Sequence, residues 1–344
     1  MPERQKSVES LISLLQSNQN LKQALEISLQ KAQQPGVETL DEFYNYLDKM
    51  LKHIPTEKEL MPSARAFYYL LSKSPSDILK KDESFTDWIK EFVRARGDFL
   101  NTTASAGCLD TFINNPQYNI ADYVREPGGW LTYNQFLVRR VKPGKRPIAN
   151  PCDDNVIVAP TDGTFMGQWP IEPDSTIMVK DTVYSIEELL GSSAYKHAFK
   201  QGVFAHTFLS IYDYHRYHMP VKGVIREIKK IPGKLWVNEA KKPDGSIENI
   251  DDVGFQFTHT RGSVIIESAI GLIAVMPVGM GHISSVDFTA EEGMELAKGD
   301  ELGYFAFGGS DIIMLFEQGK VEFIAKKERH YKQGEQIAKA IDKK

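Results

Sequence analysis

The residue pattern of this chain changes near residue 125, and this change constrains the fold more than any other feature. Before that point apolar residues recur at helical spacing, as Val8, Leu11 and Leu15 do. After it the chain consists mostly of short β-rich runs separated by Gly, Pro and Asp. The pattern predicts an α+β protein, with a helical N-terminal domain at residues 1–125 and a mostly β domain at 126–344.

Individual elements follow from the same patterns. Residues 39–42 have the form of a capping box, in which two side chains satisfy free backbone N–H groups of a first helical turn. Two further helices are expected at residues 66–71 and 88–93, the latter opened by residues 84–87. The clearest β-rich runs are residues 156–159, 203–210, 263–275, 312–316 and 321–324.

Composition limits the partners and the compartment. The formal charge of -5 and the pI near 6.0 do not indicate a nucleic-acid-binding face, which is usually basic. The two cysteines, Cys108 and Cys152, provide neither a disulfide framework nor a four-ligand zinc spacing. No apolar run approaches the ~18 residues of a membrane-spanning helix. We therefore expect a cytoplasmic protein with no nucleic-acid partner and no membrane partner.

Four segments of the second half carry residue types suited to catalysis. They are residues 158–163 with Asp162-Gly163, residues 209–220 with Asp213, His215 and His218, residues 278–286 with His282, and residues 307–311 with Ser310. Each is by itself typical of an ordinary turn or strand end. His215 and His218 are spaced as a metal pair, but no third and fourth ligand joins them at a plausible spacing, so no metal is predicted.

Taken together, these segments resemble the phosphatidylserine decarboxylase family. The likeness begins at residues 133–148, which read YNQFLVRRVKPGKRPI. It continues through the Asp162-Gly163 turn, residues 184–191 and the Asp-Tyr-His-Arg-x-His signature, and it ends at the Gly309-Ser310 cleavage site. The segments follow the order of the family over residues 130–325.

This resemblance implies self-cleavage between Gly309 and Ser310. A serine hydroxyl is a weak nucleophile and needs an adjacent base, whose tautomer a carboxylate can fix. By resemblance Ser310 is the nucleophile, His218 the base and Asp162 the orienting acid. Attack on the Gly309 carbonyl turns the amide into an ester, which then breaks by β-elimination.

Hydrolysis of the dehydrated residue leaves a pyruvoyl group at position 310 on a small chain of residues 310–344. The resemblance implies that this covalent group, the cofactor of the protein, forms a Schiff base with the substrate amine and accepts electrons when CO2 leaves. His215 or His218 is the candidate acid that protonates the α-carbon. The small chain is a partner of the large one, and the family resemblance also implies a homodimer.

The expected substrate follows from where this sequence differs from the lipid enzymes of the family. They usually carry Leu-Gly-Ser-Thr at the cleavage site, whereas residues 308–311 here read GGSD. A carboxylate at Asp311 should disfavour an anionic phosphate head group in the pocket, which His215 and His282 are expected to line as well. Residues 65–125 resemble the soluble branch that includes fungal tryptophan decarboxylases. We therefore expect a free L-amino acid, tryptophan or another aromatic.

Two alternatives stay open at this stage. The first keeps the chemistry but takes phosphatidylserine as substrate and makes phosphatidylethanolamine. The second is a non-enzymatic β-module binding protein, because residues 158–163 and 292–300 resemble turns of lipoyl- or biotinyl-type modules. Such a module needs a modifiable lysine at an exposed hairpin, and the chain has Lys180-Asp181 instead of the usual Asp-Lys or Met-Lys-Met.

Overall fold

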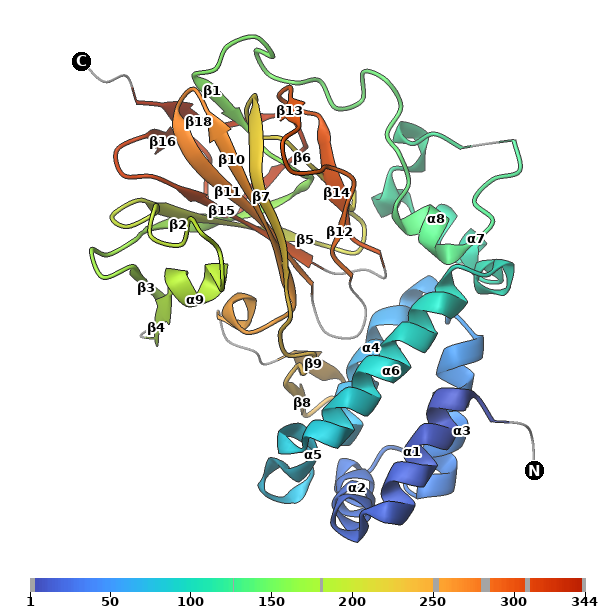
Figure 1. Cartoon of the computed structure of the whole chain (residues 1–344). Coiled ribbons are helices and arrows are strands. Elements are labelled where there is room, and N and C mark those ends of the chain that lie inside the picture. The colour runs from blue at the N-terminus through green and yellow to red at the C-terminus, as the bar shows by residue number, and fades with distance from the viewer. Residues whose placement is uncertain are drawn as a thin grey trace. The chain divides into compact units, whose positions relative to one another are not determined.

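The computed structural model describes residues 4–125, 127–179, 182–249, 254–279, 285–306 and 310–341. The chain forms two compact units, and Figure 1 shows the path of the chain through both. The first unit takes Met1–Pro116, Arg125–Phe136 and Leu235–Asp251; the second takes Gln117–Val124, Leu137–Lys234 and Asp252–Lys344. Helices dominate the first and strands the second, which confirms the predicted α+β class. A domain boundary between residues 125 and 126 stays a prediction.

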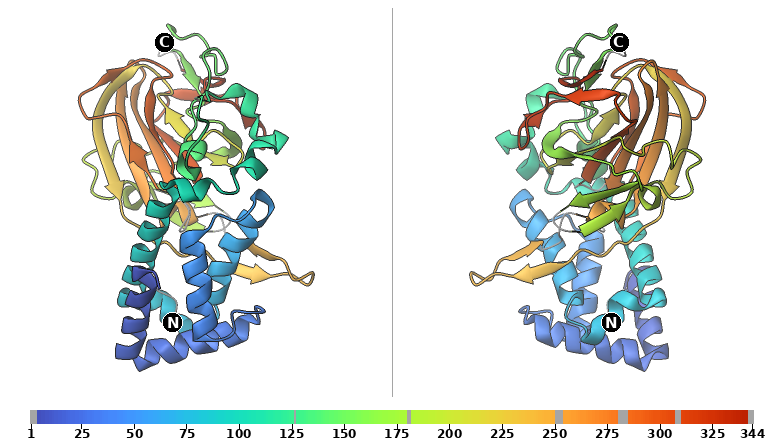
Figure 2. Two further views of the ribbon diagram at one scale, coloured as in Figure 1. Left: turned by 90° about the vertical axis from the view of Figure 1, so that its right-hand side faces the viewer. Right: turned by 90° about the vertical axis from the view of Figure 1, so that its left-hand side faces the viewer.

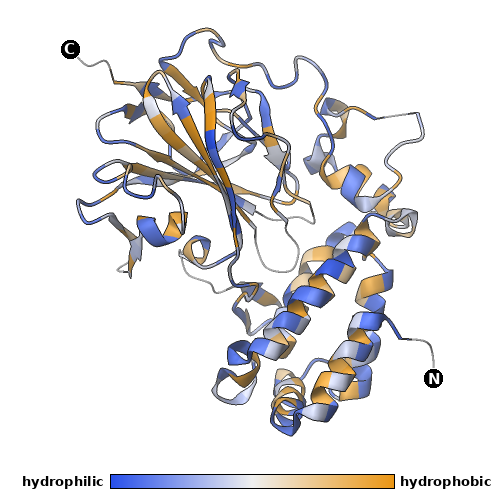
Figure 3. Cartoon of the chain, in the orientation of Figure 1, coloured by the Kyte–Doolittle hydropathy of each residue, from blue (hydrophilic) through white to orange (hydrophobic). Residues whose placement is uncertain are grey.

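Amphipathic helices build the first unit, and Figure 3 shows hydrophobic and hydrophilic residues on the same helices. The predicted capping box is confirmed: Glu42 N donates to Thr39 Oγ1, and Thr39 N donates to the Glu42 carboxylate. The helices expected at residues 66–71 and 88–93 lie within longer ones, and Asp82 caps the second of these. The α-helices in residues 1–137 are α1 (Lys6–Ser17), α2 (Gln19–Ala32), α3 (Leu40–Lys52), α4 (Glu57–Leu71), α5 (Ile78–Lys81), α6 (Glu83–Leu100), α7 (Leu109–Ile113) and α8 (Tyr133–Leu137).

A β-hairpin from far along the sequence completes the first unit. Its strands are β8 (Glu239–Lys241) and β9 (Ile247–Asn249), and it projects beside the helices in both views of Figure 2. Trp236, just before β8, stacks on Phe85 of α6, and Arg65 of α4 donates to the Ile247 carbonyl. The residue pattern did not indicate that this hairpin belongs to the helical unit, because the residues in contact are more than 150 positions apart in sequence.

The second unit is built on an eight-stranded antiparallel sheet with the order β13-β7-β10-β11-β15-β5-β2-β17. The β-rich run at residues 263–275 contains two strands of this sheet, because the chain turns at Ala269 and Ile270. The strands in this order are β13 (Glu295–Leu296), β7 (Gly223–Ile231), β10 (Arg261–Ser268), β11 (Gly271–Gly279), β15 (Ser310–Phe316), β5 (Val203–Leu209), β2 (Gly163–Pro170) and β17 (His330–Tyr331).

Smaller elements cover this sheet. Two three-stranded sheets have the orders β1-β18-β16 and β12-β14-β6, and β3 pairs with β4 in a hairpin. These elements are β1 (Val156–Val158), β3 (Thr176–Val179), β4 (Thr182–Ser185), α9 (Ile186–Leu190), β6 (Arg216–His218), η5 (Phe255–Phe257), β12 (Asp287–Phe288), β14 (Glu301–Tyr304), β16 (Val321–Phe323) and β18 (Gln336–Ala340).

Strand β15 is central and separates two hydrophobic cores. It lies between β11 and β5, and all seven of its residues are buried. Successive side chains of a strand point to opposite faces, so Ile312, Met314 and Phe316 enter one core while Ile313 and Leu315 enter the other. Strands buried on both faces lack the polar alternation of surface strands, which explains the continuous apolar run at residues 312–316.

A search of the described helices finds none that is both long enough and apolar enough to cross a membrane.

Candidate active site

Ser310 is the first residue of β15, beside the backbone of Leu209 on β5 and Gly279 on β11. Its side chain is completely buried, and its Oγ has no hydrogen-bond partner among the described residues. A buried hydroxyl left unpaired costs about 1–3 kcal/mol, so its presence calls for an explanation. An unpaired serine hydroxyl at a strand end fits a residue that is chemically converted. Gly309, the other half of the predicted cleavage site, lies outside the described residues.

His215 follows the loop that leaves β5 beside Ser310. Its ring is fully buried, and its Nδ1 lies 2.9 Å from the Asp213 carbonyl oxygen. Because a carbonyl only accepts, Nδ1 carries the proton and Nε2 carries a lone pair. Burial, assisted by the positive charge of Arg139, lowers the pKa of His215 to about 4. The ring is therefore neutral at pH 7, with an Nε2 that has no partner among the described residues.

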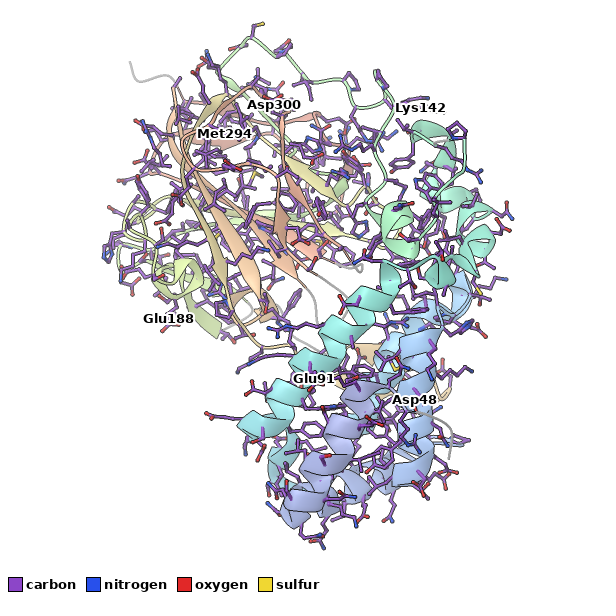
Figure 4. All side chains as sticks on the ribbon, turned by 45° about the vertical axis from the view of Figure 1, so that its right-hand side comes forward. Asp48, Glu91, Lys142, Glu188, Met294 and Asp300 are labelled. Carbon is purple, nitrogen blue, oxygen red and sulfur yellow. The ribbon has the colours of Figure 1, made fainter. Side chains whose placement is uncertain are left out.

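His218, the predicted base, is held at both ring nitrogens. Nδ1 donates to the Gly299 carbonyl at 2.9 Å, and Nε2 accepts from the Tyr214 hydroxyl at 3.1 Å. Burial lowers the pKa of His218 and raises that of Tyr214, so the tyrosine keeps its proton and acts as the donor. The turn before β14, which contains Asp300 (labelled in Figure 4), accepts a hydrogen bond from Met219 N and fixes the end of β6.

The Asp162 carboxylate is buried and forms an ion pair with the Arg146 guanidinium. Its Oδ1 and Oδ2 accept from Arg146 Nε at 2.8 and 3.1 Å, Oδ2 also accepts from Arg146 Nη2 at 2.5 Å, and Gln333 N donates to Oδ1. The structure thus places the Asp162 carboxylate on Arg146, while the ring nitrogens of His218 contact Gly299 and Tyr214. Burial keeps the pKa of His218 below its ordinary value, and the negative charge of Asp162 opposes that shift only in part.

The position after Asp162 requires glycine for steric reasons. A Cβ on Gly163 would lie 2.7 Å from both the Phe208 carbonyl oxygen and Thr207 Cγ2. Only glycine lets β2 approach β5 this closely, so the Asp-Gly pair is required by strand packing.

The histidine loop, which we define as residues 210–215 between β5 and β6 with His215 at its end, is anchored from two sides. The buried Arg139 side chain donates from Nη2 to the Tyr212 and Asp213 carbonyls at 2.8 and 3.1 Å. Asp213 Oδ2 accepts from Ser210 N and Oγ, and its Oδ1 lies 2.8 Å from His330 Nε2. His330 belongs to the predicted small chain of residues 310–344. The Asp213–His330 pair therefore links the histidine loop to that chain.

Asp311 lies on the other side of β15 from Ser310. Strand alternation places Ser310 on the face of Ile312 and Asp311 on the face of Ile313. The Asp311 carboxylate is buried and accepts from His206 Nε2 and Gln256 Nε2, both at 3.0 Å. The remaining predicted pocket residue, His282, lies outside the described residues. Among the residues that the structure describes, no group of three or more His, Cys, Asp or Glu could hold a metal ion.

Several residues of this site were missed at the sequence level. Arg146 and Arg139 lie inside the conspicuous 133–148 segment, and Tyr214 lies inside the histidine signature, so a cation–carboxylate or donor search there could have found them. No local pattern predicts that His206, Gln256 or His330 lies near the site. Each is far in sequence from the residue that it contacts and is brought there by tertiary folding.

Replacing Arg146 by methionine should destabilise the second unit strongly. The substitution leaves the Asp162 carboxylate buried without its cation, which costs about 3–5 kcal/mol. The matched control is Lys145→Met: Lys145 is half exposed and lies 3.2 Å from Asp122, so its loss should cost about 0–1 kcal/mol. Urea unfolding of both variants measures the difference. Equal free energies of unfolding would contradict this account of Asp162.

The Asp213–His330 pair should make stability depend on pH. The Asp213 hydrogen bond raises the pKa of His330 above the ordinary 6.5. Burial raises the pKa of the Asp213 carboxyl, but its bonds to His330 and Ser210 outweigh burial and lower it. The stabilisation from His330 is thus fully present below about pH 6.5 and is lost as pH rises through the folded-state pKa. The Asp213 part is lost only as pH falls through its own lowered pKa.

Unfolding of wild type and His330→Gln in urea from pH 5.5 to 9 tests this dependence. The wild-type advantage should be largest at the acidic end and shrink toward pH 9. An advantage that stays constant over this range would show that the pair carries no charge-dependent stabilisation.

The chain is similar to three curated relatives whose names agree. It is 32% identical over 272 residues to phosphatidylserine decarboxylase proenzyme 2 of Oryza sativa subsp. japonica, covering 78% of this chain and 42% of the relative. It is 34% identical over 243 residues to phosphatidylserine decarboxylase proenzyme 3 of Schizosaccharomyces pombe, covering 68% and 24%. A third relative, the phosphatidylserine decarboxylase proenzyme of Fusobacterium nucleatum subsp. nucleatum, is 28% identical with 80% and 88% covered. The chain thus spans less than half of the first two relatives and most of the third.

These names contradict the expected substrate. A free L-amino acid, tryptophan or another aromatic, was the wrong prediction, and so were the small-molecule partner and the absence of a membrane partner. The finer resemblance to fungal tryptophan decarboxylases finds no support in these relatives. A physical reason is visible at Asp311: its carboxylate is turned to the face opposite Ser310 and bound by His206 and Gln256, so its charge does not argue against a phosphate. The predicted cytoplasmic location stays a prediction.

The sequence profile of the phosphatidylserine decarboxylase family matches residues 133–339, which is more than half of the chain. Members of this family are pyruvoyl-dependent carboxy-lyases made as proenzymes. Their covalent pyruvoyl group comes from a serine after self-cleavage, as the sequence predicted for this chain. The buried Ser310 hydroxyl, which has no partner in the described part of the chain, fits such a residue. The family match also removes the alternative of a non-enzymatic β-module. The chain belongs to the phosphatidylserine decarboxylase family.

Proposed function

We propose that this protein is a self-cleaving phosphatidylserine decarboxylase that converts phosphatidylserine to phosphatidylethanolamine and CO2. The observation that carries the proposal is Ser310, whose buried hydroxyl at the start of β15 has no partner among the described residues and lies inside the family match. The names of the relatives support the lipid substrate. In this proposal Ser310 is the nucleophile and His218 the base, as predicted. Asp162 acts on His218 through its charge alone, since its carboxylate contacts Arg146 and Gln333 N while the ring is oriented by Gly299 and Tyr214.

In the self-cleavage step, Ser310 Oγ bonds to the carbonyl carbon of residue 309. The peptide C–N bond breaks, the serine proton ends on the freed amine, and an ester results. A neighbouring lone pair must hold that proton in between. His218 offers Nε2 only when the Tyr214 hydroxyl turns away, whereas His215 offers an Nε2 that is already unpaired among the described residues. Both rings have the same tautomer, but only the Nε2 of His215 can accept the serine proton without first losing a hydrogen bond to a described residue.

For decarboxylation, the pyruvoyl ketone supplies an electron sink for the pair left when CO2 departs. The residues of the chain handle the proton. His215 is neutral at pH 7, is shielded from water and is oriented by the Asp213 carbonyl. Its Nε2 can take up a proton and return it to carbon without competition from bulk solvent. The buried Arg139 keeps the loop carbonyls, and hence this ring, in place.

The substrate is tested with purified, cleaved protein and mixed vesicles of phosphatidylserine and phosphatidylcholine. We expect phosphatidylethanolamine to form, detected by mass spectrometry, and no CO2 release from free L-serine or L-tryptophan. Ser310→Ala should neither cleave nor turn over lipid, because it lacks the hydroxyl that becomes the pyruvoyl group. Release of CO2 from a free amino acid, with no turnover of the lipid, would overturn the proposal.

Replacing His215 by asparagine should lower kcat about 100-fold or more, in the range for a lost proton-transfer group. The asparagine amide can still donate to the Asp213 carbonyl, so the loop should keep its shape while the Nε2 lone pair is removed. The control is His259→Asn, since His259 Nδ1 makes the same kind of bond, 2.8 Å to the Phe255 carbonyl. Turnover of vesicle lipid by both variants is compared. Equal kcat values would remove His215 from the mechanism.

A further inference from the structure

A buried polar cluster lies on the face of β15 opposite Ser310, and neither the proposed cleavage nor the decarboxylation uses it. It contains Asp311, the residue directly after Ser310, with His206 from β5 and Gln256 from η5. All three side chains are buried, at 0%, 7% and 3% exposure. We call these three residues the Asp311 clasp. A carboxylate this deeply buried is rare unless it is paired, and here two donors converge on it.

The geometry of the clasp is convergent. His206 Nε2 and Gln256 Nε2 both lie 3.0 Å from the same oxygen, Asp311 Oδ2, and 3.4 Å from each other. Gln256 is oriented in turn by its own Oε1, which accepts from Gly254 N at 3.0 Å. The other oxygen, Asp311 Oδ1, is buried with no partner among the described residues. Two donors on one oxygen hold the side chain in a single orientation, because any rotation would break both bonds.

Residue 311 is also where cleavage changes the chain. The peptide bond before Ser310 is the one that breaks, so β15 becomes the start of a new chain at its reacting residue. From then on, the covalent chain holds residue 310 from one side, through residue 311, and β15 pairing holds it from its neighbours. The antiparallel register joins Ser310 to Leu209 and Gly279, and Asp311 to Phe208 and Val278. A frayed strand end would lose this register, since chain termini are usually the least ordered part of a strand.

We propose that the Asp311 clasp is a positioning device for residue 310, both before cleavage and in the processed enzyme. By pinning the next side chain on the far face of the strand, it fixes the backbone direction at residue 310 and aims that residue at the histidine loop. Asp311, His206 and Gln256 are positioning residues: they act through the backbone of β15. The inference rests on the proposed function only in taking residue 310 as the cleaved residue, and it does not depend on the substrate.

The test separates hydrogen bonding from simple filling of space. Asp311→Ala and His206→Phe remove the convergent bonds. Asp311→Asn and His206→Gln keep an acceptor and a donor in nearly the same places. The control for disturbance of the core is Ile313→Val, on the same strand and face and equally buried. Each proenzyme is purified, checked for folding by circular dichroism, and followed for the appearance of the 310–344 fragment and its reaction with phenylhydrazine, which traps ketones.

We expect Asp311→Ala and His206→Phe to slow fragment formation about 10- to 100-fold, the usual effect of misplacing a reacting group. Asp311→Asn, His206→Gln and Ile313→Val should stay within about 3-fold of wild type. In processed protein the two deleting variants should lower kcat and leave KM unchanged, because the clasp does not touch substrate. These cleavage and hydrazine measurements need no lipid, so they stand even if phosphatidylserine proves to be the wrong substrate.

Three results would overturn the proposal. One is a folded Asp311→Ala protein that cleaves at the wild-type rate. Another is an Asp311→Asn protein as slow as Asp311→Ala, which would show that charge is what matters. The last is an Ile313→Val protein as slow as the deleting variants, which would reduce the clasp to ordinary core packing. If Asp311→Ala does not fold, the His206→Phe and His206→Gln pair gives the same comparison.

Discussion

The burial of β15 on both faces is the constraint on which the site depends. The strand lies between β5 and β11, and every one of its residues is covered. Alternation then gives its first two residues different environments. Ser310 faces one core with a hydroxyl that no described residue binds, and Asp311 faces the other with two donors. A single strand thus separates the hydroxyl that we propose is transformed from the carboxylate that we propose holds it in place.

The same strand explains why the processed protein can stay whole. The predicted small chain contains β15, β16, β17 and β18. Strand β15 pairs with β5 and β11 of the remaining chain, β17 with β2 and β18 with β1, while β16 pairs with β18. The Asp213–His330 pair adds a polar link between the histidine loop and this small chain. Cleavage beside Ser310 therefore changes covalent connectivity at the site without removing a layer of the fold.

The buried polar groups of the site differ in their charge and in how that charge is fixed. Asp162 is neutralised by Arg146, whereas His215 and His218 are kept neutral by loss of water. Both imidazoles donate through Nδ1 to backbone carbonyls and so present Nε2 as an acceptor. The Nε2 of His218 accepts a hydrogen bond from the Tyr214 hydroxyl, and the Nε2 of His215 has no partner among the described residues. Two chemically similar rings are thereby made unequal by one neighbouring phenol.

The sequence by itself determined the fold class, the capping box at Thr39 and the family, because these depend on local patterns and on the order of motifs. The same order of motifs is what predicts Ser310 as the reacting serine. It did not determine the partners of Asp162 and Asp311, or the insertion of residues 235–249 into the helical unit. These depend on contacts between residues far apart in the chain. The error over the substrate has the same origin: residue type placed a carboxylate beside Ser310, and only the pleat of β15 decided that it faces away.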